Sequence, residues 1–337
     1  MIFHALLATM ISFAEPREEL LNLLGGEWVS QGIYAAARLD IATHLQKGPK
    51  SASELASLAQ VDEKALYRVL SMLASRGVFE ERENRVFANT SVSERLASKH
   101  PETLKSLALF YGEEIRLSFQ ELLSSVKTGR PAFNEVFQEP VFEYFKTHPE
   151  RAALFQSAMA EKTKAVTQSV IEKIRFEGTL CDVGGGKGHL LHEILKANTA
   201  LQGIHFDLPE VVASLPEPPS RVKLEGGSFF DSIPKADSYL LKSILHDWQD
   251  KEALEILKTF HKSMPDHGRI YVIELVMQSV TGDYAKLVDV LMLVVTGGCE
   301  RTLTEYQELF EKSGFELKRV FNTGTEFRIL EVGKKLL

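Results

Sequence analysis

The feature that most constrains the fold of this chain is a change in hydrophobic period after Phe176. Before that residue the apolar spacing is mostly helical. After it, a short apolar strand over residues 179–183 is followed by a glycine-rich loop and a helical pattern over residues 190–196. Repeated alternation of strand and helix is typical of a parallel sheet with helices on both faces and ligands at the carboxyl ends of its strands. The sequence therefore predicts an α/β, Rossmann-like domain over residues 176–337.

The same alternation continues to the end of the chain. Further strands are expected over residues 203–207, 222–225, 238–242 and 269–274. Helical patterns cover residues 251–264 and 303–313, and strand-like runs cover residues 315–320 and 326–332. Because only a tight connection joins the last two runs, we expect them to form an antiparallel pair at the edge of the sheet.

The first part of the chain predicts a different kind of domain. Ser51 and Glu54 have the spacing of a capping box at the start of a short helix, and Asp62 precedes a second helix. Two short extended runs follow, and helix, helix, hairpin is the order of a winged helix. We expect residues 1–110 to form a mostly helical dimerisation domain containing a winged helix, and residues 111–175 to form connecting helices that line a substrate pocket.

A winged helix raises the alternative of a DNA-binding module. The helix that would read DNA begins with Asp62 and Glu63, two carboxylates where hydrogen-bond donors toward bases and phosphates are needed. The formal net charge of -7 also disfavours nucleic acid as the main partner. We therefore expect the winged helix to serve packing or dimerisation, with no nucleic acid bound.

Residues 1–14 are apolar and require a check for a signal peptide or an anchor. They lack the Lys or Arg of a signal peptide's first region, and they are shorter than the roughly 20 apolar residues that span a bilayer. We interpret them as an apolar helix, with an uncleaved leader as the alternative. In a homodimer, this helix would be a candidate wall of the partner's pocket through Phe3, Leu6 and Leu7.

Cysteine usage bears on the cellular compartment. Only Cys181 and Cys299 occur, which gives no disulfide framework and fits a reducing environment. We expect a cytoplasmic protein without a membrane partner.

The glycine loop at residues 182–188 predicts a nucleotide-type ligand, because glycine lets backbone approach a ligand closely. The dinucleotide fingerprint needs glycines at positions one, three and six; from Gly184, the third is Gly186 but the sixth is His189. Asp207, after the second strand, is spaced to accept both ribose hydroxyls of an adenosine. That role suits NAD and S-adenosylmethionine alike. Since S-adenosylmethionine has no phosphate, the incomplete fingerprint favours it.

Four motifs in order carry a family resemblance. They are Asp-Val-Gly-Gly-Gly-Lys-Gly at 182–188, Phe-Asp-Leu-Pro at 206–209, Leu-Lys-Ser-Ile-Leu-His-Asp-Trp at 241–248 and Gly-Gly-Cys-Glu-Arg-Thr at 297–302. Together they resemble the caffeate, hydroxyindole and polyketide type of S-adenosylmethionine-dependent O-methyltransferase, over nearly the whole chain. The resemblance implies an S-adenosylmethionine cofactor, a small hydroxylated acceptor and a homodimer.

The resemblance also implies a set of cofactor-binding residues. A loop glycine matched by Gly184 contacts the cofactor, Asp207 holds the ribose, and Lys242 lies near the methionine end. Where the family often has an aspartate for the adenine amino group, this chain has Ser228, whose hydroxyl accepts a hydrogen bond without charge assistance. Phe229 can compensate by packing on the adenine. Two neighbours of these residues, Gly186 and Leu208, complete the predicted set.

Methyl transfer to a hydroxyl needs a base, because a neutral phenol with a pKa of about 10 is a poor nucleophile. His246 follows the apolar run 240–245, interpreted as a buried strand, and is expected to face the cleft as a neutral imidazole. The resemblance matches Glu274 and Glu300 to the two glutamates that flank the family's histidine. Considered alone, each residue has a structural interpretation: His246 as a core histidine, Glu274 as a solvated residue that ends the fifth strand, and Glu300 as a helix-capping partner of Arg301. Their expected placement together favours the catalytic interpretation.

Three further expectations complete the functional interpretation. No compact cluster of oxygen ligands is visible beside His246, so no metal is expected, although metal-assisted transfer is the main rival mechanism. The alternative function is a winged-helix regulator that binds S-adenosylmethionine without turnover. Side chains expected to contact the acceptor, besides a contribution from Tyr111, are Phe155, Met159, Asp247 and Met292, although Phe155 and Met159 also have the spacing of core residues.

Overall fold

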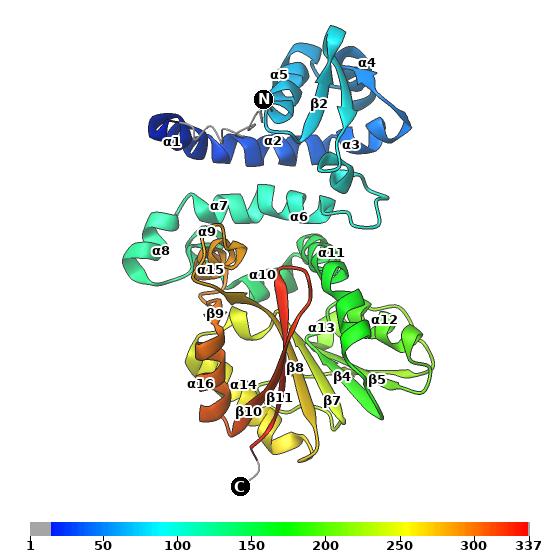
Figure 1. Cartoon of the computed structure of the whole chain (residues 1–337), viewed down its shortest axis with the longest axis vertical. Coiled ribbons are helices and arrows are strands. Elements are labelled where there is room, and N and C mark those ends of the chain that lie inside the picture. The colour runs from blue at the N-terminus through cyan, green and yellow to red at the C-terminus, as the bar shows by residue number, and fades with distance from the viewer. Residues whose placement is uncertain (1–14, 336–337) are drawn as a thin grey trace, which may run out of the picture. The chain divides into compact units, whose positions relative to one another are not determined.

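The computed structural model describes residues 15–335, so the expected helix over residues 1–14, with Phe3, Leu6 and Leu7, lies outside the described residues. The chain forms two compact units, which divide between His100 and Pro101 (Figure 1). No helix of the described part has the length and apolar character needed to cross a bilayer.

The first unit is mostly helical and contains a small antiparallel sheet. Its strands lie in the order β1-β3-β2. Its elements are α1 (Pro16–Leu24), α2 (Gly26–Arg38), α3 (Ile41–His44), β1 (Lys50–Ser51), α4 (Ala52–Ala59), α5 (Glu63–Ala74), β2 (Phe79–Arg82) and β3 (Val86–Asn89). Short 3₁₀ turns follow at Leu45–Lys47, Glu83–Arg85 and Ser93–Leu96. The predicted order of two helices and an antiparallel strand pair is present as α4, α5, β2 and β3.

Side-chain caps explain where α4 and α5 begin. The Ser51 hydroxyl accepts from the Glu54 backbone N–H at 3.2 Å, and the Glu54 carboxylate accepts from the Ser51 N–H at 2.7 Å. Asp62 accepts from the Ala65 N–H at 2.8 Å. Each cap satisfies backbone donors that have no partner inside the helix. The capping box predicted from the sequence is therefore confirmed.

An apolar stripe on α1 and α2 remains exposed within the described chain. Trp28 is 72% exposed and Leu23 is 71% exposed, and Leu20 and Leu24 are also more than half exposed. Side chains of this size rarely gather on a surface without a partner. This stripe has the helical spacing expected from the sequence, but it contributes nothing to the unit's own core.

The second unit begins with a helical segment and continues as an α/β domain. The helical segment comprises α6 (Lys105–Phe110), a π turn (Tyr111–Ile115), α7 (Arg116–Phe119), α8 (Leu122–Thr128), α9 (Ala132–Phe137), α10 (Val141–Thr147) and α11 (Pro149–Lys173). The α/β part comprises β4 (Thr179–Val183), α12 (His189–Ala197), β5 (Gln202–Asp207), α13 (Pro209–Ala213), β6 (Val222–Gly226), β7 (Ser238–Lys242), α14 (Asp250–Ser263), β8 (Arg269–Met277), α15 (Tyr284–Val295), β9 (Arg301–Thr302), α16 (Leu303–Lys312), β10 (Phe315–Asn322) and β11 (Phe327–Lys334).

The large sheet has the strand order β10-β11-β8-β7-β4-β5-β6. Strands β6, β5, β4, β7 and β8 are parallel, whereas β11 pairs antiparallel with β8 and β10 antiparallel with β11. The Rossmann-like fold and the antiparallel pair at the edge, both predicted from the sequence, are confirmed. The strand order reverses beside β4, where ligands bind in folds of this type.

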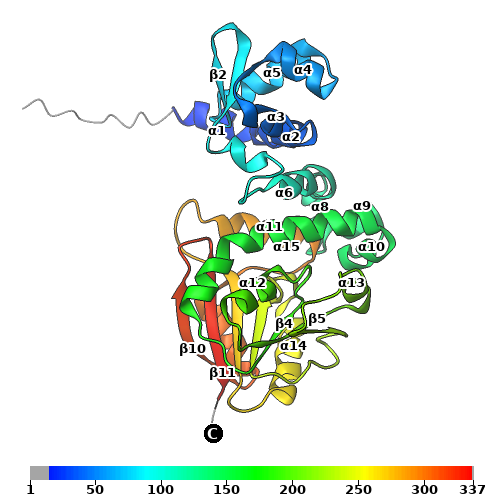
Figure 2. The same cartoon turned by 90° about the vertical axis from the view of Figure 1, so that its right-hand side faces the viewer.

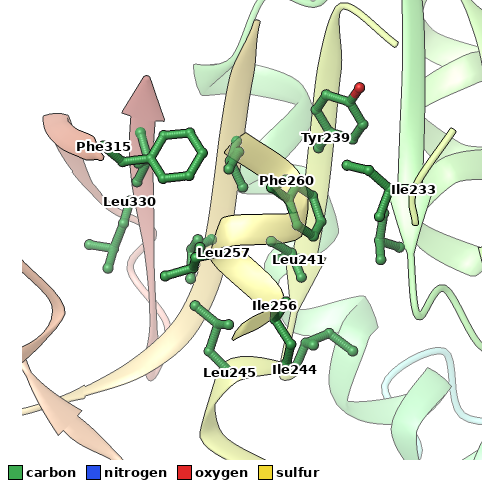
Figure 3. Packing of buried hydrophobic residues seen from close by; sticks show 14 of the residues in the cluster. Ile233, Tyr239, Leu241, Ile244, Leu245, Ile256, Leu257, Phe260, Phe315 and Leu330 are labelled. Carbon is green, nitrogen blue, oxygen red and sulfur yellow. The ribbon is translucent and has the colours of Figure 1, made fainter. Parts of the chain in front are cut away.

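Two apolar layers hold the sheet between its helices. Neighbouring strand residues point to opposite faces, so Leu241 joins the layer under α14 and α16, while Leu240 joins the layer under α11, α12 and α15. Figure 3 shows Ile256, Leu257 and Phe260 of α14 packed over the strands, and Figure 2 shows α11 and α12 on the other face. This packing fixes the carboxyl ends of the strands, where the predicted site residues lie.

The structure corrects two strand boundaries predicted from the sequence. The strand expected over residues 238–242 is confirmed as β7, and the interpretation of residues 240–245 as strand is wrong, because Ser243 has a left-handed backbone with φ of 53° that turns the chain. Strand β8 runs on to Met277, so Glu274 lies inside the strand and does not end it; its backbone pairs with that of Arg328 on β11. Glu274 is also fully buried, so it is not a solvated residue.

Candidate active site

The glycine loop follows β4 and leads into α12. Gly184, Gly186 and Gly188 have φ values of 69°, 56° and 72°, which side chains other than glycine rarely adopt. A Cβ at Gly184 would overlap the Ile244 side chain, and one at Gly186 would lie 2.7 Å from the Gln156 side-chain oxygen. The loop therefore forms a cradle, a concave surface made of backbone atoms, and a side chain larger than that of glycine would fill the space beside it.

Asp207 ends β5 with its carboxylate directed at this loop. One oxygen accepts from the Gly186 N–H at 2.8 Å, and the other accepts from the Leu208 N–H at 2.7 Å. Burial raises the pKa of Asp207, and the two backbone hydrogen bonds oppose that effect by favouring the charged form. The carboxylate thus joins the loop to the next strand and stays partly accessible to a ligand.

Ser228 and Phe229 follow β6. The Ser228 hydroxyl accepts from the Phe230 N–H at 3.2 Å, which leaves its own O–H available as a donor. The Phe229 ring lies 5.1 Å from the Phe230 ring and 6.2 Å from the Trp248 ring. Phe229 is therefore part of an aromatic group at the end of the sheet and does not stand alone.

Lys242 ends β7, and its ammonium donates to the Ser243 hydroxyl at 2.9 Å. The ammonium also lies 4.8 Å from the centroid of the Phe327 ring on β11. Burial and the charge of Lys162 together lower the pKa of Lys242 to about 8, while the carboxylates of Glu274, Glu326 and Asp182 act in the opposite direction.

His246 lies in the short 3₁₀ turn Leu245–Asp247 that follows Ser243 and is 7% exposed. Its Nδ1 is 2.6 Å from the Glu300 Oε1, a short hydrogen bond. Its Nε2 lies 3.7 Å from the Asp247 carboxylate, beyond hydrogen-bond distance, and forms no hydrogen bond with the described residues. With Nδ1 held by Glu300, Nε2 is the ring nitrogen left to take up a proton.

Glu274 positions the histidine through the backbone. Its Oε1 accepts from the N–H groups of Ile244 and Leu245 at 2.9 and 3.0 Å, and its Oε2 lies 3.8 Å from the His246 Nδ1. The His246 carbonyl accepts from the Cys299 N–H at 2.9 Å. A Cβ at Gly298 would overlap that carbonyl, so glycine is needed for the two segments to approach this closely.

The buried carboxyl groups of Glu274 and Glu300 and the partly buried one of Asp247 surround one imidazole, and removal from water is the main influence on the pKa of each. It raises the pKa of Glu300 to about 8, that of Asp247 to about 6, and that of Glu274 above its ordinary value. The outer oxygens of Glu274 and Glu300 have no hydrogen-bond partner among the described residues.

The His246, Glu274 and Glu300 side chains also offer donor atoms within 4.8 Å of one another, a set that could ligate a metal ion. From the sequence we expected these three residues to meet. No compact ligand cluster was visible there, because the residues come from three separate segments. The hydrogen bond between His246 and Glu300 already occupies two of the donor atoms. The absence of a metal stays a prediction.

Two of the residues predicted to contact the acceptor lie on one helix, α11. Phe155 of α11 packs in an aromatic cluster, 4.7 Å from the Phe145 ring and 5.6 Å from the Phe110 ring. Met159, one turn later, packs on the same cluster, which includes Val295 of α15. Their core-like spacing thus reflects real packing, although both side chains remain partly accessible.

The structure does not join all of the predicted acceptor contacts in one cluster. Met292 is 7% exposed and packs in the layer beneath the sheet, not with Phe155. Asp247 follows His246 directly, and Tyr111 lies in the π turn, where it forms a hydrogen bond with Tyr284. Asp247 is the one of these residues nearest to the imidazole.

Sequence reasoning missed Lys162. It lies on α11 three residues after Met159 and seven after Phe155, on the same side of the helix, and is only 7% exposed. The signal available was a lysine continuing an otherwise apolar stripe.

The geometry defines the class of protein. A parallel sheet has a bare glycine loop after β4 and an acidic residue ending β5, and a hydrogen-bonded histidine follows β7. The glycine cradle and the Asp207 carboxylate fit the adenosyl part of S-adenosylmethionine, which presents two ribose hydroxyls and no phosphate. This is the arrangement of an S-adenosylmethionine-dependent methyltransferase.

Comparison with known proteins gives the family. Residues 119–316 match the model of an O-methyltransferase domain, and residues 21–99 match that of an O-methyltransferase dimerisation domain. Phenazine O-methyltransferase PhzM of Lysobacter antibioticus is 36% identical over 322 residues, covering 93% of this chain and 94% of that protein. The chain belongs to this O-methyltransferase family, and it is an S-adenosylmethionine-dependent O-methyltransferase.

Solved structures agree with this assignment. LaPhzM superposes with a TM-score of 0.88 at 35% identity, covering 96% of this chain and 100% of that one. An O-methyltransferase of neocarzinostatin biosynthesis, solved with S-adenosylmethionine and 2-hydroxy-5-methyl naphthoic acid, superposes with a TM-score of 0.76 at 29% identity, covering 91% and 96%. The cofactor inferred from the sequence, S-adenosylmethionine, is confirmed.

Proposed function

We propose that this enzyme methylates a hydroxyl group on an aromatic small molecule, with His246 as the general base. The observation that carries the proposal is the 2.6 Å hydrogen bond between the His246 Nδ1 and Glu300. A phenazine and a naphthoic acid occur in the names of two related proteins, which supports a fused aromatic acceptor.

The cofactor supplies an electrophilic methyl group on a positively charged sulfur. Gly184, Gly186 and Leu208 would approach the adenosyl part with backbone, and Asp207 would accept from the ribose hydroxyls. Ser228 would accept from the adenine amino group through the second lone pair of its hydroxyl oxygen, with Phe229 packed beside it. Lys242 would face the methionine end.

The tautomer of His246 decides whether it can act as a base. When Nδ1–H donates to an ionised Glu300, Nε2 carries a lone pair and can take the proton of an acceptor hydroxyl. Glu300 then stabilises the imidazolium that forms, and Glu274 holds the turn through two backbone N–H groups. Asp247 lies on the Nε2 side and would orient the acceptor, while Phe155 and Met159 would wall the aromatic ring.

The test is the His246→Ala variant. It should lose about 10²- to 10⁴-fold in turnover on a panel of phenols, the usual contribution of a general base. Binding of S-adenosylhomocysteine, measured by calorimetry, should stay within a factor of two or so of the wild type. His267→Ala, which removes an exposed histidine, is the matched control.

The same experiment distinguishes the alternative, a regulator that binds the cofactor without turnover. Unchanged turnover in His246→Ala would remove the base assignment. A wild type that methylates no phenol and retards DNA fragments would overturn the proposed function. The carboxylates Asp62 and Glu63 at the start of α5 argue against DNA binding.

We further propose that the chain is a homodimer, that its first unit is a winged helix used for pairing, and that it works in the cytosol. The match to a dimerisation domain and the exposed stripe of Leu20, Leu23, Leu24 and Trp28 support pairing. Changing Leu23 and Trp28 together to Glu should shift the mass measured by light scattering from dimer to monomer. A wild type that is already monomeric would contradict the pairing proposal.

A further inference from the structure

Two lysine side chains face one aromatic ring beside the carboxyl end of β7. The ammonium of Lys242 lies 4.8 Å from the centroid of the Phe327 ring, and that of Lys162 lies 6.0 Å from the same centroid. Lys162 comes from α11 and Lys242 from the sheet, so two separate elements direct positive charge at one place.

Neither ammonium has a nearby anion within the described part of the chain. No carboxylate oxygen lies within 4.0 Å of either nitrogen, and Lys242 has only the Ser243 hydroxyl as a partner. The carboxylates of Glu274, Glu326 and Asp182 influence Lys242 from greater distances. The positive charge of Lys162 also lowers the pKa of Glu300 and that of Asp247, against the larger effect of burial.

Holding two ammonium groups near each other without an anion costs free energy unless a ligand offsets their charge. A buried or partly buried charge is normally paired, and two like charges near each other repel. An aromatic face attracts a cation by only about 1–2 kcal/mol, which is less than the usual cost of burying an unpaired charge. The lowered pKa of Lys242 reflects both burial and the charge of Lys162. A bound anion would satisfy both ammoniums at once.

We propose that Lys162 and Lys242 form a carboxylate-binding pair that a bound ligand completes. A carboxylate has two acceptor oxygens, one for each ammonium. Two ligands can supply it: the amino-acid end of the cofactor, or an acceptor that carries an acid group. The first source needs only the cofactor; the second rests on the proposed function. In both cases Lys162 is a binding residue and not a base.

The cofactor arm of the test compares two probes by calorimetry. S-adenosylhomocysteine carries the amino-acid end, whereas 5′-methylthioadenosine keeps the adenosyl group without it. Lys162→Met should weaken S-adenosylhomocysteine by about 10-fold or more, the effect of losing one charge-assisted hydrogen bond, and leave 5′-methylthioadenosine within about twofold. Lys162→Arg should restore most of the affinity. Lys164→Met, an exposed lysine on the same helix, is the control and should change neither.

The acceptor arm compares a hydroxybenzoate with its methyl ester as methyl acceptors. If the acceptor supplies the carboxylate, Lys162→Met should raise KM for the acid about 10-fold more than it raises KM for the ester. An effect in either arm supports the pair and identifies the source of the carboxylate. Equal weakening of both cofactor probes, or no change in either arm, overturns it. If the wild type methylates no phenol, the proposed function fails and the cofactor arm alone decides.

Discussion

Replacing Glu300 by Gln should stabilise the folded chain, and by more as the pH rises. Glu300 is 2% exposed, and only one of its oxygens has a partner, the His246 Nδ1. Burial raises its pKa from 4.5 to about 8. A carboxyl group held this far from water is costly when ionised, and glutamine has nearly the same shape without the charge.

The sign and the size follow from the two pKa values. The folded state binds the Glu300 proton more tightly than the unfolded state, so this contribution to stability is fully present below pH 4.5 and is lost as the pH rises through 8. The rise in the Glu300 pKa from 4.5 to about 8 corresponds to a loss of at most about 5 kcal/mol in the free energy of unfolding, at about 1.4 kcal/mol for each pKa unit. Because glutamine does not titrate, the free energy of unfolding of the variant minus that of the wild type should increase from pH 5 to pH 9.

Urea unfolding followed by circular dichroism at pH 5, 7 and 9 measures this difference directly. Glu308→Gln, which changes a carboxylate that is 58% exposed, is the control and should give a difference near zero at all three values. A difference between Glu300→Gln and wild type that stays constant, or that falls with pH, would refute the conclusion that burial of an ionised Glu300 costs stability. Turnover of this variant should fall, since glutamine cannot stabilise the imidazolium by charge.

Two further predictions concern the loop and a helix cap. Gly184→Ala should weaken S-adenosylhomocysteine binding at least about 10-fold by calorimetry, because its Cβ would overlap the Ile244 side chain; Gly282→Ala, with a similar φ of 76° but open space around it, should bind normally. Thr302→Ala removes the capping box of α16 and should lower the free energy of unfolding by about 1 kcal/mol in urea, and an unchanged midpoint would contradict that role of the hydroxyl.

The parts of the fold that the sequence predicted are those with a local physical signal. Alternating strand and helical periods predicted the parallel sheet, and four glycines between β4 and α12 predicted the backbone cradle. The spacing of Asp207 predicted a carboxylate at the end of β5, beside that cradle. In each case the neighbouring residues alone determine the conformation, so no distant contact is needed to infer it.

The features that the sequence did not predict depend on distant contacts. The helical stripe around Lys162 does not reveal the partner of its side chain, because the Phe327 ring that it faces lies 165 positions later in the chain. The extension of β8 beyond Glu274 depends on pairing with β11 and β9, which no residue of β8 itself encodes. Burial of Glu274 follows from that extension, and with it the two hydrogen bonds that hold the turn before His246.

Ser243 is the residue that converts an apolar run into a strand followed by a turn, and its role can be measured. Its φ of 53° is costly for a residue with a Cβ, by roughly 1 kcal/mol. Its N–H donates to the Ile273 carbonyl at 3.1 Å, and its hydroxyl accepts from Lys242.

Ser243→Ala and Ser243→Gly both lose the hydroxyl, but only glycine also loses the Cβ. Relief of the backbone strain should make the glycine variant more stable than the alanine variant by about 1 kcal/mol in urea unfolding. The greater freedom of glycine in the unfolded chain makes the measured difference smaller than this. Both should keep the Nδ1 contact of His246, because Glu274 holds the following two N–H groups. An alanine variant as stable as the glycine variant would mean that the backbone at residue 243 is not strained, and that the hydrogen bonds of Glu274 alone bring His246 to Glu300.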